Sequence, residues 1–278
     1  MNSVKEYVIL GHMKNFRIVK YQIPIDKKKY HPTGRLRIVL LSDLHNQKYG
    51  RKNEILIREI DRLKPDLVAA VGDMFTPEKG RTEHAALNLM EALAEKYPVC
   101  YGNGNHEYIM KLDTDFFGVR YERYVRGLKN AGVLLLENEH ADITLKGVSV
   151  RIYGLQLPWR FYRRFSYEKL SQEEMRKYLG TGTQDRYQIL LAHNPMCFSA
   201  YEKWGADLTL SGHLHGGFIR LPLLGGIMSP QCVPFPKYDR GIFEKNGHYM
   251  AVSAGLGSHS GIPRIGNPME LVVLDLIP

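Results

Sequence analysis

The 278-residue sequence predicts an α/β fold in which two mixed β-sheets pack together and carry helices on their outer faces. In the first half of the chain, short apolar runs alternate with segments of helical periodicity, and from Val133 onward short strands of alternating polarity take over. No linker rich in Gly, Ser or Pro and no internal repeat separates the halves. We therefore expect a single domain over residues 1–278.

The first elements form a β-α-β unit. Residues 16–25 alternate in polarity like an edge strand, and 35–45 contains an apolar run with the length of a buried strand. Apolar residues at helical spacing over 52–66 predict a helix that ends before Pro65, and 66–74 is a second buried strand.

The same alternation continues with a helix over 83–97, a third strand over 98–107 and another helix over 113–132, which Gly132 closes. At least three strands of the first half should therefore be parallel.

Two glycine-containing turns indicate hairpins in the second half, at Lys146-Gly147 and at Asn246-Gly247. They predict a sheet that is mixed. The aromatic, basic and partly helical segment 156–186 stands between the halves, and we interpret it as an inserted cap segment.

The net charge of the chain indicates which classes of partner it could bind. Thirty-eight Lys and Arg against 29 Asp and Glu give a net charge of +9, which suits an anionic substrate, nucleic acid or an acidic membrane surface. The excess is dispersed rather than arranged as a track, so we expect no stable nucleic-acid partner, whereas contact with a membrane surface stays open.

The cysteines and the N-terminus predict a cytoplasmic protein, with peripheral membrane contact left open. Cys100, Cys197 and Cys232 are odd in number and far apart, which favours neither a disulfide framework nor a thiolate zinc site. The short apolar patch of residues 1–16 is too brief for a signal sequence or a membrane span.

Five short motifs carry the chemistry: SDLH, GDM, GNHE, LLAHNP and GHLHGG. Each follows an apolar strand-like run, and strand ends of an α/β sheet converge on one edge, so we expect their polar side chains to lie together. Any one of these histidines alone would more often be an ordinary core or surface residue. The polar residues that the five motifs bring together are Asp43, His45, Asp73, Asn105, His106, His193, His213 and His215.

These residue types predict a metal site. Imidazole combined with carboxylate suits divalent first-row ions, and two ions about 3.5–4 Å apart need one bridging carboxylate. Asp73 is alone in its motif and is the natural bridge. In GHLHGG an extended backbone sends both imidazoles to the same side, and the glycines allow close approach.

The ordered motifs resemble those of the calcineurin-like metallophosphoesterase superfamily over about residues 40–215, and the flanking segments are similar to the bacterial YaeI/YkuE-like branch. The resemblance implies a four-layer α/β/β/α sandwich and two divalent metal ions, with manganese, iron and zinc all open. By this resemblance one ion is bound by Asp43, His45, Asp73 and His215, and the other by Asp73, Asn105, His193 and His213.

The implied reaction is hydrolysis of a phosphodiester or pyrophosphate bond by a metal-bridging hydroxide. A bound metal lowers the pKa of water from about 15.7 to about 7, so no protein base is required. His106 matches the family position that protonates the leaving oxygen or stabilises the phosphate.

Departures from the family pattern bear on the substrate. Phosphoprotein phosphatases of the superfamily have GDxxDRG, but here the motif continues as GDMFTPE, with Thr76 and Pro77 in place of its Asp and Arg. A phosphoserine phosphatase is therefore not expected. Leu214 and Phe218 also replace the Thr and Gln of the branch, which alters the wall beside the ligands.

The substrate is expected to be a small anionic phosphoester, lipid-linked or nucleotide-linked. Candidates for binding it are His259 and Arg264 in a Gly-rich loop, for which a plain turn is equally favoured, and Arg160 and Arg163. The apolar segment 218–236 is either a hairpin packed on the core or an apolar substrate groove.

Two alternatives of other classes are a metal-dependent nuclease and a non-catalytic scaffold. A nuclease should present a contiguous basic track with stacking aromatic side chains. A scaffold should have lost ligands, whereas all seven family positions are filled here.

Overall fold

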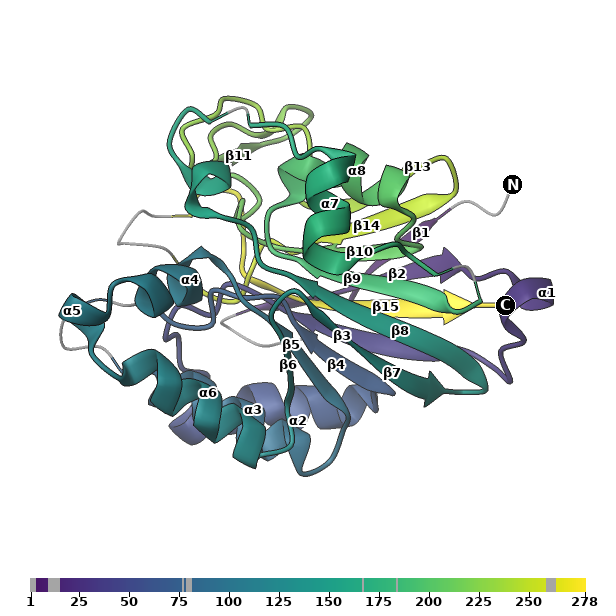
Figure 1. Ribbon diagram of the computed structural model, residues 1–278, viewed down its shortest axis with the longest axis horizontal. Helices are drawn as coiled ribbons and strands as arrows, with labels where there is room; N and C mark the ends of the chain where they lie inside the picture. Colours follow the sequence, from purple (N-terminus) through teal and green to yellow (C-terminus); the bar gives the residue numbers. More distant parts are fainter. Residues whose placement is uncertain are drawn as a thin grey trace.

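The computed structural model describes residues 4–9, 16–76, 78, 82–166, 168–183, 185–258 and 264–278. Two large sheets lie face to face with helices outside them (Figure 1). The predicted four-layer α/β/β/α sandwich is confirmed.

The first sheet has seven strands in the described part of the chain, in the order β1-β2-β15-β3-β4-β5-β6. β3 to β6 are parallel, and β15 runs antiparallel to β3 and parallel to β2. The strands are β1 (Lys5–Ile9), β2 (Arg17–Pro24), β3 (Leu36–Leu41), β4 (Leu67–Ala70), β5 (Val99–Gly102), β6 (Leu134–Leu136) and β15 (Glu270–Ile277).

The second sheet has six strands within the described residues, in the order β13-β14-β10-β9-β8-β7. Its four inner strands are parallel, and β13 and β7 are antiparallel edges. The strands are β7 (Glu139–Leu145), β8 (Val148–Leu155), β9 (Tyr187–Ala192), β10 (Leu208–Ser211), β13 (Gly241–Lys245) and β14 (His248–Val252). A separate short hairpin joins β11 (Arg220–Leu221) to β12 (Gly225–Gly226).

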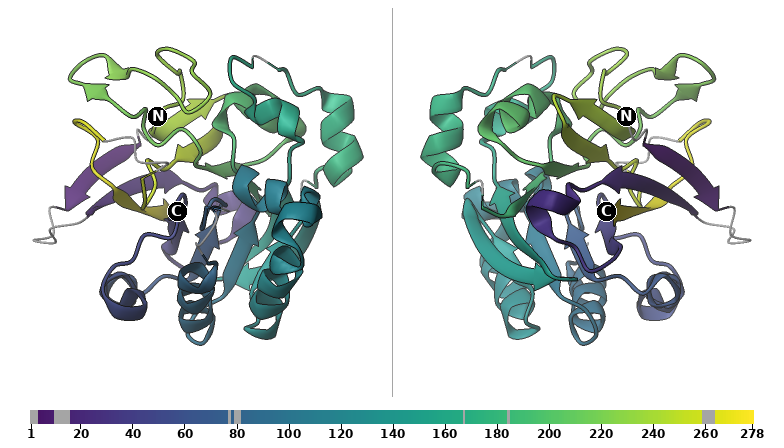
Figure 2. Two further views of the ribbon diagram at one scale, coloured as in Figure 1. Left: turned by 90° about the vertical axis from the view of Figure 1, so that its left-hand side faces the viewer. Right: turned by 90° about the vertical axis from the view of Figure 1, so that its right-hand side faces the viewer.

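The helices cover the two outer faces. In Figure 1, α2 (Glu54–Leu63), α3 (His84–Ala94) and α6 (Arg120–Asn130) lie under the first sheet, and α7 (Gln172–Leu179) and α8 (Phe198–Trp204) lie over the second. Figure 2 shows the same layers from both ends. The remaining short helices are α1 (Lys27–Tyr30), α4 (Asn105–Leu112), α5 (Thr114–Phe117), η1 (Arg51–Asn53), η2 (Trp159–Tyr162) and η3 (Pro195–Cys197).

The apolar strand runs are buried because both of their faces are covered. In β3, Ile38 and Leu40 face the second sheet, whereas Val39 and Leu41 pack in the core that α2, α3 and α6 share. This alternation is the two-residue period of a strand. Because the strands are covered on both sides, they hold the first residues of the loops at their carboxyl ends in fixed positions.

Local turn signals were reliable. Lys146 and Gly147 have φ of 48° and 79°, and Asn246 and Gly247 have φ of 52° and 80°. Two successive positive φ values suit a two-residue hairpin turn, and both predicted hairpins are confirmed by the pairings of β7 with β8 and β13 with β14.

The prediction of an edge strand over 16–25 is wrong. β2 pairs with β1 on one side and with β15 on the other. Because β15 is the last strand of the chain, no pattern near residue 20 could show that it would pair there.

Two further boundaries differ from the predictions. The helix expected over 113–132 is two helices, α5 and α6, because Gly118 interrupts it with φ of 57°. The strand expected over 98–107 ends at Gly102, and α4 begins at Asn105. Asn105 and His106 therefore lie in the first turn of a helix.

The segment 156–186 packs on the outer face of the second sheet. Tyr162 and Met175 are buried in a core that they share with Trp204 of α8 and Leu190 of β9. Its role as a cap stays a prediction. Across the described residues, no helix combines the length and the apolar character that crossing a bilayer requires.

Candidate metal centre

The motif residues meet at one edge of the two sheets. Asp43 and His45 follow β3, Asp73 follows β4, His193 directly follows β9, and His213 and His215 follow β10. The expectation that strand ends bring them together is confirmed, because they fall into three groups whose ligand atoms lie within 4.8 Å of one another. The groups are Asp43, His45 and His215; Asp73, His193 and His213; and His45, Asp73 and His106.

In the first group two imidazoles and one carboxylate face a common point. The Nε2 atoms of His45 and His215 are 3.1 Å apart, and their rings are nearly parallel, with an interplanar angle of 22°. Asp43 Oδ1 lies 3.4 Å from His215 Nε2 and 3.8 Å from His45 Nε2. Three buried donors converging in this way suit a divalent first-row ion.

The second group has the arrangement of an oriented metal ligand. His193 Nδ1 lies 2.6 Å from the carbonyl oxygen of Val71, so a proton on Nδ1 satisfies that carbonyl and leaves Nε2 for a metal. Nε2 is 3.1 Å from Asp73 Oδ2. The His213 ring lies edge-on to the His193 ring, with 5.2 Å between centroids.

The side-chain oxygen of Asn105 indicates whether a metal ion fits the site. This Oδ1 atom is buried and accepts no hydrogen bond from the described residues. A buried acceptor without a partner costs about 1–3 kcal/mol, and a cation bound by the oxygen removes that cost. The residues present therefore fit a metal ion, although ligation of each residue stays a prediction.

The third group shares His45 with the first group and Asp73 with the second. Asp73 Oδ2 lies 3.7 Å from His106 Nε2, and Oδ1 accepts a hydrogen bond from the backbone N–H of His106 at 2.9 Å. The His106 ring stands edge-on to the His45 ring at 5.1 Å. The side chain of His106 is 13% exposed, whereas those of His45 and His193 are 0% exposed, so His106 lies on the solvent side.

Burial and charge act against each other in the pKa values. Burial raises the pKa of Asp43 to about 6. Burial also acts to raise the pKa of Asp73, but the charges of His193 and His106 outweigh it and hold that pKa well below the usual value. Burial would lower the pKa of His193, yet the Asp73 carboxylate raises it to about 9. Without metal, the positive charge of a protonated His193 thus compensates the negative charge of the Asp73 carboxylate.

The backbone is strained at these residues. Asp43, His45, Asp73, His213 and His215 have φ between 46° and 68°, in the left-handed region that side-chain-bearing residues rarely adopt. Such conformations persist only where the surroundings enforce them, and they concentrate at functional sites.

Glu107 holds the Asp73 loop in this conformation. Its buried carboxylate accepts hydrogen bonds from the backbone N–H groups of Asp73, Met74 and Gly104, at 2.9, 2.9 and 3.0 Å, and from the Tyr101 hydroxyl at 2.8 Å. The sequence analysis gave Glu107 no role. Its position three residues after the N-cap of α4, where a capping-box acid stands, is the signal that could have found it.

Two motif glycines allow close approach. A Cβ at Gly212 would overlap Ser42 and Asp43, and a Cβ at Gly104 would overlap Asp73. The glycines before the histidine pair and before Asn105 therefore let neighbouring loops touch at the site.

The structure places the predicted substrate residues as follows, and their role stays a prediction. Arg264 lies behind His215: its Nη2 is 2.9 Å from Nδ1 of that ring and donates to the carbonyl of Ala254 at 2.6 Å. Arg160 pairs with Glu174, and Arg163 is exposed. His259 lies outside the described residues.

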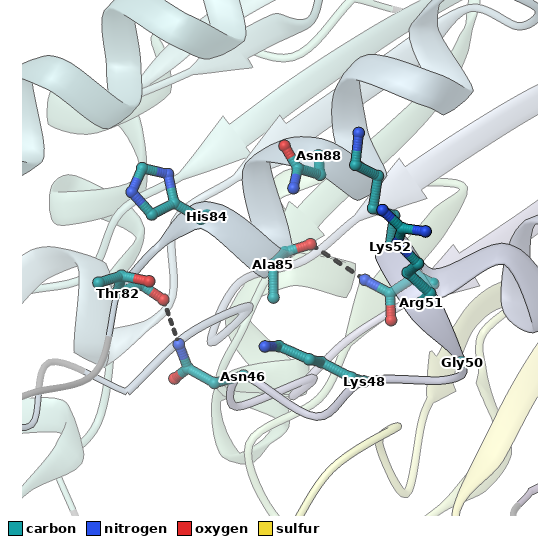
Figure 3. A pocket seen from close by; sticks show the side chains of 10 residues that line it. Asn46, Lys48, Gly50, Arg51, Lys52, Thr82, His84, Ala85 and Asn88 are labelled. Atoms are coloured by element: carbon teal, nitrogen blue, oxygen red, sulfur yellow. Dashed lines mark hydrogen bonds between the residues drawn. The ribbon is translucent and has the colours of Figure 1, made fainter.

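A basic pocket of about 540 Å³ lies beside the centre, between the loop after β3 and the start of α3 (Figure 3). Asn46, which follows His45 in the sequence, forms one wall of the pocket. The side-chain amide of Asn46 donates to the carbonyl of Thr82 at 2.6 Å. Lys48, Arg51 and Lys52 line it and form no ion pair with the described residues; the other lining residues are Gly50, Asn53, Thr82, His84, Ala85 and Asn88. The sequence analysis missed this pocket.

The fold and these donor groups define a metal-dependent hydrolase of phosphoesters. The chain belongs to the calcineurin-like phosphoesterase family, whose family model matches residues 36–217. This confirms the resemblance seen in the motifs.

Three curated relatives match nearly the whole chain. An uncharacterized metallophosphoesterase of Aquifex aeolicus is 30% identical over 97% of both chains. Uncharacterized metallophosphoesterase YkoQ of Bacillus subtilis is 27% identical over 93% of this chain and 90% of its own. Phosphodiesterase YaeI of Escherichia coli is 23% identical over 94% of this chain and 88% of its own, in agreement with the predicted branch.

Proposed function

We propose that the chain hydrolyses phosphodiester or pyrophosphate bonds of a small anionic substrate with two divalent metal ions. The observation that carries this proposal is the position of Asp73: it lies with His193 and His213 in one group of ligand atoms and with His45 in another, and His45 lies in turn with Asp43 and His215. A carboxylate shared in this way suits a bridge between two ions.

Each residue has a separate part in the proposed reaction. When bound, the ions supply a nucleophilic water of lowered pKa and neutralise charge on the phosphate oxygens. Asp73 and the buried histidines hold the ions, and Glu107 keeps the Asp73 loop in place. His106, the more exposed imidazole, donates a proton to the leaving oxygen.

Two features support a diester or pyrophosphate substrate over a phosphomonoester. The Thr76 hydroxyl donates to Asn46 Oδ1 at 2.9 Å, and this residue replaces the acid that orients the acid histidine in phosphoprotein phosphatases of the superfamily. The basic pocket beside His45 suits a second anionic group of the substrate. The name of the relative YaeI, a phosphodiesterase, agrees with this choice.

The first test compares bis-p-nitrophenyl phosphate with p-nitrophenyl phosphate on chelator-treated protein, before and after addition of manganese, iron or zinc. We expect metal-dependent hydrolysis with kcat/KM for the diester at least about tenfold higher, a difference of about 1.4 kcal/mol in the barrier. Activity that survives metal removal, or a preference for the monoester, would contradict the proposal.

A second prediction concerns the basic pocket. Lys48→Ala combined with Lys52→Ala is expected to weaken inhibition of diester hydrolysis by ADP-ribose about tenfold, because two cations for its diphosphate are lost. Hydrolysis of the smaller bis-p-nitrophenyl phosphate should change less than about twofold. Lys129→Ala, an exposed lysine on α6, is the control, and unchanged inhibition in the double variant would exclude the pocket.

We also propose that the chain acts in the cytoplasm, on a substrate with a lipid or nucleotide part, and without a stable nucleic-acid partner.

A further inference from the structure

Large apolar side chains are exposed at one end of the molecule, around the β11–β12 hairpin. Leu223 is fully exposed, at 107% of its reference area, and Leu224 and Phe235 are 61% and 60% exposed. We call this the apolar tip; its members are Ile219, Leu221, Leu223, Leu224, Phe235 and Ile265. The apolar side chains of the hairpin therefore do not pack on the core. This is contrary to one of the two interpretations of segment 218–236 from the sequence, which expected a hairpin packed on the core.

Four members of the apolar tip share one depression. Leu221, Leu223, Leu224 and Phe235 line it beside Lys237, it measures about 500 Å³, and Ile219 and Ile265 form a β-bridge next to the hairpin. In Figures 1 and 2 the hairpin projects from the second-sheet side, away from both sheets. Soluble proteins rarely expose contiguous apolar patches of more than about a few hundred Å², and larger patches mark interaction sites.

Basic side chains flank the apolar tip. Arg163, Arg164 and Lys169 line one shallow depression with the exposed Phe165. The backbone N–H of Phe165 donates to the carbonyl of Gln231, which lies between the hairpin and Phe235, at 2.7 Å. Lys237 lines the depression of the apolar tip. None of these four cations forms an ion pair with a residue that the structure describes. Two acids lie among these residues, and each faces an arginine: Glu168 lies 4.0 Å from Arg160, and Asp239 pairs with Arg220.

We infer that this face docks on an anionic lipid bilayer. A projecting tip with apolar side chains enters the boundary between headgroups and acyl chains, and flanking Lys and Arg contact anionic headgroups. A second copy of the chain fits less well, because a symmetric dimer through this face would bring the same cations together. The docking surface goes beyond the proposed function and does not depend on it.

The docking face and the metal centre are joined by one short loop. The loop that leads to the hairpin starts directly after the centre, where the ring of Phe218 stacks on His215 with 6.2 Å between centroids. If the proposed function holds, the substrate class that this geometry favours is a lipid-borne phosphoester.

The test is cosedimentation of the full chain with vesicles of phosphatidylcholine alone and with vesicles that also contain phosphatidylglycerol. We expect at least about tenfold tighter binding to the anionic vesicles. Leu223→Ser combined with Leu224→Ser should weaken that binding at least about tenfold, because burial of two leucine side chains is lost. Leu112→Ser combined with Phe116→Ser, two exposed apolar residues of α4 and α5, is the matched control and should bind like the wild type.

Equal binding of the Leu223/Leu224 variant and the wild type, or no binding of the wild type to anionic vesicles, would overturn the inference. Self-association of the wild type in analytical ultracentrifugation that the variant abolishes, without vesicle binding, would also overturn it and assign the face to a protein contact. Binding is measured without substrate, so a chain that fails the diesterase test can still pass this one. Both serine variants should retain bis-p-nitrophenyl phosphate hydrolysis within about twofold, since neither site touches the metal centre.

Discussion

Asp73→Asn is expected to lower kcat/KM for bis-p-nitrophenyl phosphate by at least about 10³-fold, because it removes the carboxylate that we propose as the bridge between two ions. The side chain keeps its shape, so Oδ1 can still accept from the His106 N–H. A neutral amide cannot bridge two cations, and its NH₂ group would point a donor at His193 or at the ion. The expected consequence is loss of metal as well as of activity.

The measurement for this variant combines steady-state kinetics with elemental analysis of the purified protein. Bound metal should fall from two ions to one or none per chain. Asp142→Asn is the matched control, because Asp142 pairs with Arg151 on the outer edge of the second sheet, far along the chain from every motif. Two bound ions with wild-type activity in Asp73→Asn would remove Asp73 from the centre.

His106→Ala is expected to leave the metal content unchanged and to lower kcat by about 10²–10⁴-fold for a diester with an alkyl leaving group. The loss should be at least about tenfold smaller with a p-nitrophenolate leaving group, which needs little protonation as its bond breaks. His106 is suited to this part because its ring lies on the solvent side of Asp73, 3.7 Å from Oδ2.

The two substrates separate the two roles considered for His106. Equal losses with both leaving groups would show that the imidazole stabilises the phosphate rather than acting as an acid. Loss of a metal ion would show that it is a ligand. His140→Ala, an exposed histidine of β7, should behave like the wild type.

Most strands and both hairpin turns of this protein followed from its sequence, because each of these signals involves neighbouring residues. Apolar runs such as Ile38 to Leu41 predict strands covered on both faces, and Asn246-Gly247 predicts a hairpin turn, without any knowledge of distant segments. The order of the five motifs was enough to predict a shared metal site and the family.

Only the tertiary structure decided which distant segments meet. β15 pairs with β2 across more than two hundred residues of sequence, which turns a predicted edge strand into an inner one. The basic pocket needs the loop after β3 and the start of α3 side by side, and the local alternation of polarity carries no information about that contact.

The burial of the apolar tip could not be predicted from the sequence either. The composition of 218–236 was compatible with a hairpin packed on the core and with an apolar substrate groove, because apolar residues are required for both. Burial is decided by what packs against a segment, and in the described chain nothing covers Leu223. The sequence by itself thus determined the strands, the turns and the chemistry of the motif residues, whereas the packing of segments remote in sequence decided the pocket, the exposed face and the positions of the ligand atoms.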